Sequence, residues 1–213
     1  EMKLLQDHYG AVFFNVIDSS FEDPGRRGVA RMDEFCDLVK HHGIEASIKI
    51  HLRAESVTKL EDALLDKLKH TGVDVVGVGV ESGLERELRS FGKIAHVQDN
   101  VDGVRRLGEG DRFYTILGHI MFTPILELDE LPRKMEFLED LGYAWDFLSV
   151  SNNLLVFSGT AYQTYLENSE LKEPCDALDT IIPYRFQDPR VGRVANGLNS
   201  LKRRFPEILD TYN

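Results

Sequence analysis

Apolar residues along this chain recur with two periods, one typical of β-strands and the other of α-helices. Five runs rich in apolar, β-branched and aromatic residues predict strands over 11–20, 46–55, 73–81, 112–122 and 146–157. Apolar positions three or four residues apart predict helices over 28–42, 60–70, 84–91, 96–108 and 128–141. Strands that alternate with helices of this length imply βαβ units, so we expect an α/β fold built on a parallel sheet.

The order of residues within the strands favours an open barrel over a sheet that has helices on both faces. Near 47–53, one face carries Ile48, Ile50 and Leu52, and the other carries Ser47, Lys49, His51 and Arg53. A parallel strand covered by helices on both sides should not carry lysine, histidine and arginine along one face. A strand that lines a wet cavity can do so. We therefore expect a barrel with a polar interior.

The strand at 73–81 shows the same alternation and ends in a carboxylate. Its apolar face carries Val76, Val78 and Val80, and its other face carries Gly77, Gly79 and Glu81. The two glycines are expected to clear space on the face of the carboxylate. Ligands bind at the carboxyl ends of the strands in α/β barrels. Polar groups at the other strand ends are therefore candidates as well, namely Asp18, Ser19, Arg53, Ser82, His119 and Asn153.

Each of these groups also has a purely structural interpretation. Asp18 can turn the chain or cap the segment that follows, and Arg53 can form a buried ion pair with Glu81. His119 can be a hydrogen-bonded barrel histidine, and Asn153 can satisfy local backbone groups. Their shared location favours a ligand site, because independent structural accidents would not all fall at strand ends.

The two ends of the chain depart from the alternating pattern. Residues 1–10 read as a helix that enters a strand, as though the chain began part-way through a repeating unit. Residues 170–213 contain the stretches EPCDAL and IIPYRFQDPR and a basic helix near 190–204. We expect a barrel domain over 1–169 and a C-terminal helical extension over 170–213. Left-handed helix caps are expected at Gly43, Gly72 and Gly142.

Composition narrows the classes of function. The 213 residues have a formal net charge of −11, which argues against a nucleic-acid-binding surface. The sequence has no run of ~18 apolar residues and no leader pattern, so we expect a cytoplasmic protein. Cys36 and Cys175 have neither the number nor the spacing of a metal-ligand motif. The motifs GxSxG, HExxH and GxxxxGK[ST] are absent, and GVGVESG fails the GxGxxG spacing.

Six segments follow one another in an order and spacing that resemble a known family. They are FFNVIDSSFEDP, IHLRAESV, LEDALLDKLKHTGVDVVGVGVESG, LRSFGKIAHVQDNVDGVRRL, GHIMFTPILELDEL and LLVFSGTAYQTYLENSEL. The first is similar to a strand that is followed by V-D-D-x-F, and the third is similar to a helix and strand that end in Glu-Ser-Gly. Together they resemble the radical S-adenosylmethionine enzymes, in particular the branch whose members often carry a cobalamin-binding domain.

The resemblance implies a partial (β/α)6 barrel of the TIM type, without its first strand, that binds S-adenosylmethionine across its open top. It also implies a [4Fe-4S] cluster that cleaves this cofactor reductively to a 5′-deoxyadenosyl radical, or an enzyme that transfers its methyl group. In that scheme Glu81 and Ser82 lie near the methionine or ribose of the cofactor, and Arg53 holds a carboxylate or orients Glu81. Asp18 and Ser19 lie near the methionine amine. The remaining candidate cofactor contacts are His119 and Asn153.

The chain also departs from that family. The CxxxCxxC motif is absent, and two distant cysteines cannot supply the three thiolates that it provides. Ser19 stands where the family has a second aspartate, and Phe122-Thr123-Pro124 stands where the family usually has Gly-Leu-Pro. We therefore expect a carboxy-terminal fragment, inactive alone, of an enzyme whose cluster loop, first strand and any cobalamin domain lie upstream.

Two other functions stay open. A cluster-less relative would bind a ligand or a protein partner without catalysis. An unrelated barrel lyase or aldolase would use Lys49, His51 and Glu81, with Lys49 as the Schiff-base amine. For the favoured function we expect a small-molecule or peptide substrate, an electron donor such as flavodoxin or ferredoxin, and neither nucleic acid nor membrane as a partner. Phe13 and Phe14 on an exposed strand edge are expected to mediate association with another chain.

Overall fold

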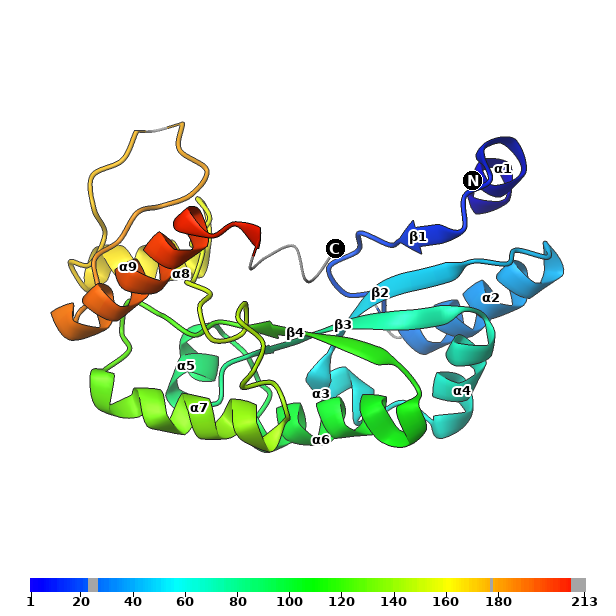
Figure 1. Ribbon diagram of the computed structural model, residues 1–213, viewed down its shortest axis with the longest axis horizontal. Helices are drawn as coiled ribbons and strands as arrows, with labels where there is room; N and C mark the ends of the chain where they lie inside the picture. The colour runs from blue at the N-terminus through cyan, green and yellow to red at the C-terminus, as the bar shows by residue number, and fades with distance from the viewer. Residues whose placement is uncertain (23–26, 177, 208–213) are drawn as a thin grey trace. The chain divides into compact units, whose positions relative to one another are not determined.

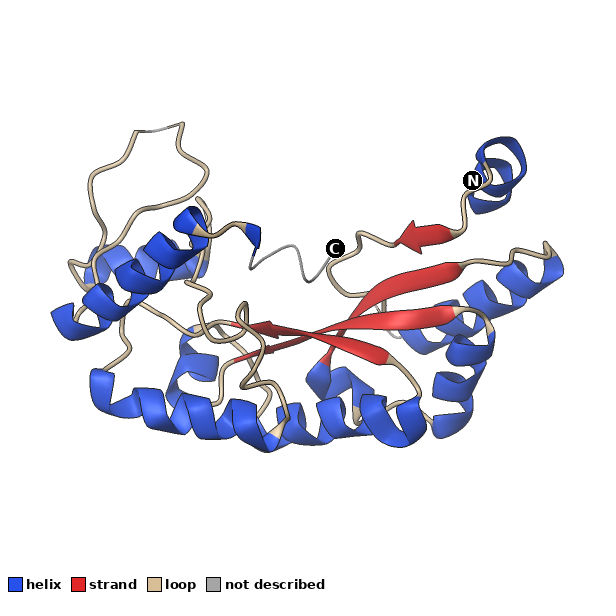
Figure 2. Ribbon diagram, viewed as in Figure 1, coloured by secondary structure: helices blue, strands red, loops and turns tan. Residues whose placement is uncertain are grey.

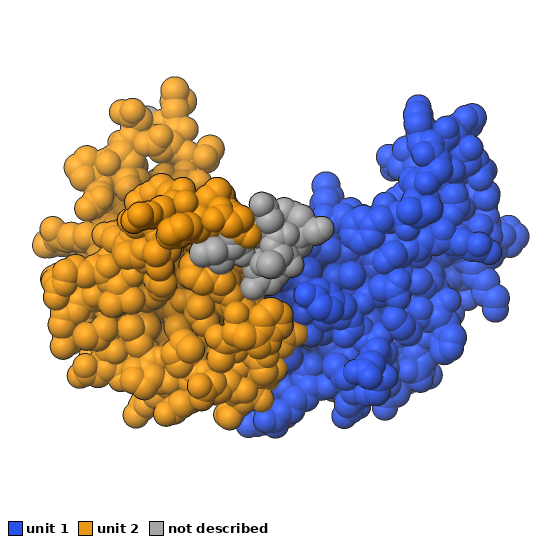
Figure 3. Space-filling model, viewed as in Figure 1, with its two compact units in different colours: residues 1–80, 95–118 blue, residues 81–94, 119–213 orange. Residues whose placement is uncertain are grey.

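The computed structural model describes residues 1–22, 27–176 and 178–207, so Asp23 and Pro24 of the first quoted segment lie outside the described residues (Figure 1). Helices and strands alternate along the first half of the chain (Figure 2). The chain divides into two compact units, one of residues 1–80 with 95–118 and one of residues 81–94 with 119–213 (Figure 3).

A sheet of four strands organises the first unit. Only the last residue of the third strand, Glu81, and the last residue of the fourth strand, His119, belong to the second unit. The strands follow one another across the sheet in chain order: β1 (Phe13–Asn15), β2 (Ser47–Arg53), β3 (Val73–Glu81) and β4 (Tyr114–His119). β2 pairs in parallel with both β1 and β3. The expected α/β class is therefore confirmed, whereas closure into a (β/α)6 barrel stays a prediction.

One face of the sheet is apolar and covered by helices. Ile48 and Ile50 are fully buried, and β2 alternates between buried and partly exposed residues along its whole length, as its sequence predicts. α4 (Asp62–His70) and α6 (Val97–Gly108) lie along this face (Figure 1). α6 approaches α3 (Ala54–Val57) so closely that a Cβ atom on Gly103 would lie 2.4 Å from the Ala54 carbonyl oxygen. The other helices of this unit are α1 (Met2–Tyr9), α2 (Gly28–His41) and the short η1 (Glu109–Asp111).

The regular elements named in the second unit are helices, and long turns and loops join them. Its elements are α5 (Glu85–Ser90), η2 (Leu128–Glu130), α7 (Leu131–Asp140), α8 (Ala161–Asn168) and α9 (Pro189–Arg204). Val191 and Ala195 of α9 share a buried cluster with Leu84, Phe122 and Leu126. The C-terminal extension therefore contributes to the same core as residues near the tip of β3. The domain boundary expected at 169/170 stays a prediction.

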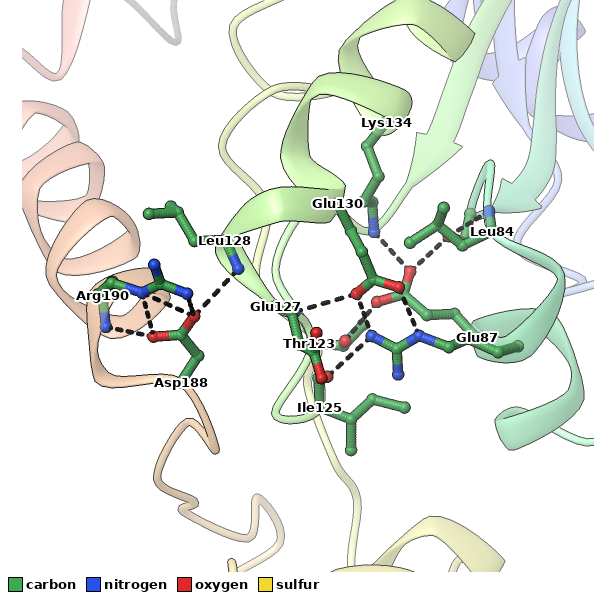
Figure 4. A network of polar contacts seen from close by, with 12 residues as sticks. Leu84, Glu87, Thr123, Ile125, Glu127, Leu128, Glu130, Lys134, Asp188 and Arg190 are labelled. Atoms are coloured by element: carbon green, nitrogen blue, oxygen red, sulfur yellow. Dashed lines mark hydrogen bonds and ion pairs between the residues drawn. The ribbon is translucent and has the colours of Figure 1, made fainter.

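The start of α9 is fixed by a side-chain cap. Asp188 precedes the helix, and its carboxylate accepts a hydrogen bond from the backbone N–H of Arg190 at 2.9 Å. The same carboxylate accepts from the backbone N–H of Leu128 at 3.1 Å (Figure 4). This residue therefore ties the extension to the segment that leads into α7.

The strand expected over 146–157 is wrong. Residues 147–151 form turns, and this stretch pairs only through isolated bridges, such as that between Asn153 and Phe122. Asp146 is the reason, because its carboxylate accepts hydrogen bonds from the backbone N–H groups of Leu148 and Ser149, each at 3.1 Å. Such local side-chain bonds offer the backbone an alternative to a sheet ladder.

Most of the other expected elements are confirmed, although β1 and β4 are shorter than the apolar runs that predict them. All five predicted helices of the first 141 residues are present, and so is the basic helix near 190–204. Gly43, Gly72 and Gly142 have φ values of 57°, 100° and 79°, which confirms their left-handed conformation. Among the described residues, no helix combines the length and the apolar character needed to cross a membrane.

Candidate functional site

Glu81, at the tip of β3, has a backbone conformation that side chains seldom adopt. Its φ is 58°, in the left-handed region that favours glycine. Its carbonyl oxygen accepts a hydrogen bond from the backbone N–H of Ile120 at 2.8 Å. A non-glycine residue in this region costs ~1–3 kcal/mol, persists only where the surrounding structure imposes it, and is found most often at functional sites. Asp111 and Glu170 also have positive φ, so the combination of this conformation with the position at a strand tip makes Glu81 a candidate functional residue.

Lys93 is the charged partner of Glu81. Its Nζ lies 3.2 Å from Glu81 Oε1, and the two side chains are 23% and 27% exposed. Lys93 is placed by the end of α5, because Gly92 turns the chain with φ 71° and the Lys93 N–H donates to the Leu88 carbonyl. Sequence reasoning placed Lys93 in a family-like segment but did not identify it as a site residue.

Ser82 and Gly83 complete the tip, and both face inward. Ser82 is fully buried, and its Oγ donates to Glu87 Oε2 at 2.5 Å and accepts from the backbone N–H of Leu84 at 3.1 Å. A Cβ atom on Gly83 would lie 2.5 Å from the ring of Phe137, so only glycine fits. Ser82 therefore has a supporting position, and Glu81 is the member of the tip that a ligand can reach.

Glu87 is the centre of a buried polar network beneath the tip (Figure 4). Its Oε2 lies 2.6 Å from Lys134 Nζ, and neither side chain is exposed. Its Oε1 accepts from Thr123 Oγ1 at 2.5 Å, and Lys134 also donates to the Ile120 carbonyl at 2.6 Å. Burial lowers the pKa of Lys134, although the Glu87 carboxylate opposes this.

In the first unit, the partner of Arg53 is Glu22, which sequence reasoning did not identify. Glu22 is 5% exposed, and its Oε1 accepts from the backbone N–H of Arg53 at 3.1 Å and from Arg53 Nε at 3.0 Å. Burial raises the pKa of the Glu22 carboxyl, but hydrogen bonds from its own backbone and from Arg53 outweigh burial and lower it. The ion pair considered between Arg53 and Glu81 is replaced by Arg53–Glu22 and Lys93–Glu81.

Three oxygen atoms in the neighbourhood of this ion pair are buried and have no hydrogen-bond partner, namely Ser20 Oγ, Glu22 Oε2 and Glu55 Oε2. Glu55 Oε1 lies 4.0 Å from Arg53 Nε. A buried carboxylate oxygen without a donor is costly. The two carboxyl groups and one guanidinium leave one formal negative charge. This chemistry suits a cationic group that donates hydrogen bonds, such as an ammonium.

The other candidates lie in different environments. Asp18 and Ser19 are exposed, in the segment between β1 and Phe21. Asn153 forms the bridge with Phe122, and its Oδ1 is buried without a partner. The cofactor contacts expected of Asp18, Ser19 and Asn153 therefore stay predictions.

His119 is enclosed in the second unit. It is 2% exposed, and its Nδ1 donates to the Ser149 carbonyl at 2.8 Å, which leaves Nε2 buried without a partner. Burial and the nearby Lys134 charge lower the pKa of His119 to about 3, so the ring is neutral at pH 7. His119 is thus enclosed by protein, and the cofactor contact expected of it stays a prediction.

The space expected beside Gly77 is filled by a side chain. A Cβ atom at Gly77 would lie 2.4 Å from Cδ2 of His51. The His51 Nδ1 is 3.3 Å from the Val16 carbonyl oxygen. Gly77 therefore makes room for the imidazole of the neighbouring strand, and the expectation that it makes room for a ligand is corrected.

The residues of this chain do not fit an iron–sulfur cluster. Its two cysteines are Cys36, buried on α2, and Cys175 in the second unit. The described residues contain no group of three or more histidine, cysteine, aspartate and glutamate side chains that could hold a metal ion. A cluster needs thiolate ligands that this sequence does not supply.

No family model and no curated protein matches this chain. Solved structures do match, and the class of protein that they share is the cobalamin-dependent S-adenosylmethionine radical enzyme. One is OxsB with aqua-cobalamin and S-adenosylmethionine bound, at a TM-score of 0.77 and 17% identity, covering 96% of this chain and 36% of that one. Another is the radical S-adenosylmethionine methyltransferase TsrM from Kitasatospora setae with cobalamin and a [4Fe-4S] cluster, at a TM-score of 0.53 and 15% identity, covering 79% and 30%.

At these identities the likeness shows the fold. The chain therefore has the fold of part of these enzymes and spans about a third of the length of OxsB.

Proposed function

We propose that this chain is part of a radical S-adenosylmethionine enzyme and binds S-adenosylmethionine with the tip of β3. The observation that carries the proposal is the left-handed Glu81, whose carboxylate is held by Lys93 and is still 27% exposed. The fold shared with OxsB and TsrM supports it. S-adenosylmethionine carries ribose hydroxyls and positive charge, both of which a carboxylate binds well.

Glu81 would accept hydrogen bonds from the bound molecule, and Lys93 would set the direction of its carboxylate. Both residues of this contact are proposed to be held in place before the ligand binds. The turn at Gly92 places Lys93, and the backbone N–H of Ile120 donates to the Glu81 carbonyl. Binding groups fixed in this way lose little conformational entropy when the ligand arrives.

Within the first unit, the residues around Arg53 are proposed as a separate candidate site for an amino-acid group. The unpartnered oxygens of Ser20, Glu22 and Glu55 suit an ammonium group, and the Arg53 guanidinium suits a carboxylate. An amino-acid group carries both, as the methionine part of S-adenosylmethionine does. Asp18 remains a further proposed contact near the amine, because it lies in the same segment as Ser20.

When bound beside a reduced [4Fe-4S] cluster, S-adenosylmethionine supplies radical or methyl-transfer chemistry, and the protein supplies binding and orientation. The cluster ligands and any cobalamin are proposed to come from outside this sequence. This chain would then contribute cofactor contacts and part of the substrate cavity.

The proposal is tested by titrating S-adenosylmethionine into this chain in a calorimeter. Glu81→Gln should weaken binding at least about tenfold, because a charge-assisted contact is replaced by a neutral one. Glu139→Gln, an exposed residue on α7, is the matched control and should bind as the unaltered chain does. Equal affinity of Glu81→Gln and the unaltered chain, or no binding by the unaltered chain, would refute the proposal for this tip.

A cluster-less binding module makes a different prediction for the native-length protein. If that protein binds S-adenosylmethionine but holds no iron after anaerobic reconstitution, the binding part of the proposal stands and the radical chemistry is excluded. Borohydride trapping on Lys49 with a carbonyl substrate would instead support a Schiff-base enzyme.

A further inference from the structure

The buried Glu87–Lys134 pair joins three parts of the second unit to the tip of β3. Glu87 belongs to α5 and Lys134 to α7, while Thr123 and Ile120 belong to the segment that follows β4. Ser82 of the tip donates to the same carboxylate as Lys134. The carboxylate therefore accepts from one ammonium and two hydroxyls that come from three separate segments (Figure 4).

Stability alone does not account for such a pair. Both side chains are 0% exposed, so two charges have been removed from water. Replacing a buried ion pair with apolar residues of similar volume is often neutral or stabilising, because the desolvation of the charges is avoided. A fully satisfied polar network does, however, fix the geometry of the groups that it connects.

The geometry that this network fixes is that of Glu81. The residue after Glu81 is Ser82, whose hydroxyl is bound to Glu87 at 2.5 Å. The carbonyl of Glu81 accepts from the N–H of Ile120, and the carbonyl of Ile120 accepts from Lys134. The network therefore reaches Glu81 at two points, through Ser82 and through the Glu81 carbonyl, and it supplies the surroundings that a left-handed glutamate requires.

We infer that Glu87 and Lys134 are positioning residues that hold Glu81 in its left-handed conformation and so direct its carboxylate toward the ligand. Neither contacts the ligand, since both are enclosed. The inference rests on the proposed function of Glu81 and adds the residues through which the site is oriented.

A double-mutant cycle tests the inference, with S-adenosylmethionine affinity as the readout. Ser82→Ala cuts the link between Glu87 and the tip, and should weaken binding at least about fivefold in the otherwise unaltered chain. In a Glu81→Gln background the same change should have no further effect, because the residue that it positions no longer makes its contact. A merely structural role would give the same loss in both backgrounds.

A second variant separates orientation from stability. Glu87→Met combined with Lys134→Met removes both charges at similar volume. The variant should keep a cooperative thermal transition, at a midpoint lowered because the Ser82 and Thr123 hydroxyls and the Ile120 carbonyl lose these partners, and should weaken binding at least about fivefold. If this double variant does not fold, the double-mutant cycle of Ser82→Ala and Glu81→Gln by itself tests whether the network positions Glu81. Thr123→Ser keeps the hydroxyl that donates to Glu87 and should bind S-adenosylmethionine as the unaltered chain does. Thr123→Val removes that hydroxyl and should weaken binding.

The outcomes distinguish the two proposals. If Glu81→Gln leaves the affinity unchanged, the proposed function of the tip fails and the inference fails with it. If Glu81→Gln weakens binding but Ser82→Ala has no effect, or has an effect that simply adds to it, the inference alone is overturned.

Discussion

Removing one charge of the buried Glu87–Lys134 pair should destabilise the second unit far more than removing an exposed charge. In Glu87→Gln, the Lys134 ammonium loses the carboxylate 2.6 Å away and keeps the Ile120 carbonyl as an acceptor. Breaking a buried ion pair at one partner costs ~3–5 kcal/mol, since the remaining charge is left uncompensated. We therefore expect Glu87→Gln to lower the free energy of unfolding by that amount at neutral pH.

The sign of the pH dependence follows from Lys134. Burial lowers the pKa of this residue in the folded chain, so the folded state binds fewer protons there than the unfolded state does. Stability then rises with pH between the folded-state pKa of Lys134 and its ordinary value of 10.5. Loss of the Glu87 charge lowers that pKa further, so this window extends to lower pH in the variant. Part of the lost stability should return by about pH 9.

Urea unfolding followed by far-ultraviolet circular dichroism measures both effects. Glu139→Gln, on the exposed side of the same helix as Lys134, is the control and should change the free energy by less than ~0.5 kcal/mol. The reasoning is refuted if Glu87→Gln costs less than ~1 kcal/mol, or if its deficit relative to the unaltered chain is the same at neutral and alkaline pH.

Three further predictions concern other parts of the molecule. Gly83→Ala should destabilise the chain by ~1–3 kcal/mol because its Cβ atom would meet the Phe137 ring at 2.5 Å. Gly197→Ala, with open space around the new Cβ atom, should leave the thermal midpoint unchanged or raise it. The ring of His119 should stay neutral down to about pH 4 in an NMR titration, since its pKa is lowered to about 3. Stability should accordingly fall as pH drops from about 6.5 toward 3, because the unfolded chain binds this proton first. A ring that titrates near its ordinary value would contradict the burial argument. Finally, this chain should retain no iron after anaerobic reconstitution with iron and sulfide, because two distant cysteines cannot form a cluster site. A cluster-like absorption spectrum from the chain alone would show that expectation to be wrong.

Part of the site could be predicted because it depends on short-range pattern. Alternation in β2 and β3 placed Arg53 and Glu81 at strand ends, and both lie there. The partners of these residues could not be predicted in the same way. Glu22 is 31 residues from Arg53, and Lys93 is 12 residues from Glu81, so their pairing depends on how loops return to the sheet. The only sequence signal for either was its place in a family-like segment.

The failures have physical reasons of the same kind. The run at 146–157 has strand-like composition, but Asp146 satisfies the backbone of the residues that follow it, and turns form instead. Gly77 was expected to clear space for a ligand. That space is occupied by the imidazole of His51, on the neighbouring strand.

The sequence by itself determined the alternating helices and strands, the parallel α/β class, the apolar face of β2 and the glycines that end helices. These features follow from periodicity and from the backbone freedom of single residues. Only the tertiary structure decided that Glu81 is left-handed and that a buried carboxylate, Glu87, binds Lys134 and Ser82 beneath it. Burial and charge pairing are properties of residues brought together from distant segments, and no local pattern in the chain encodes them.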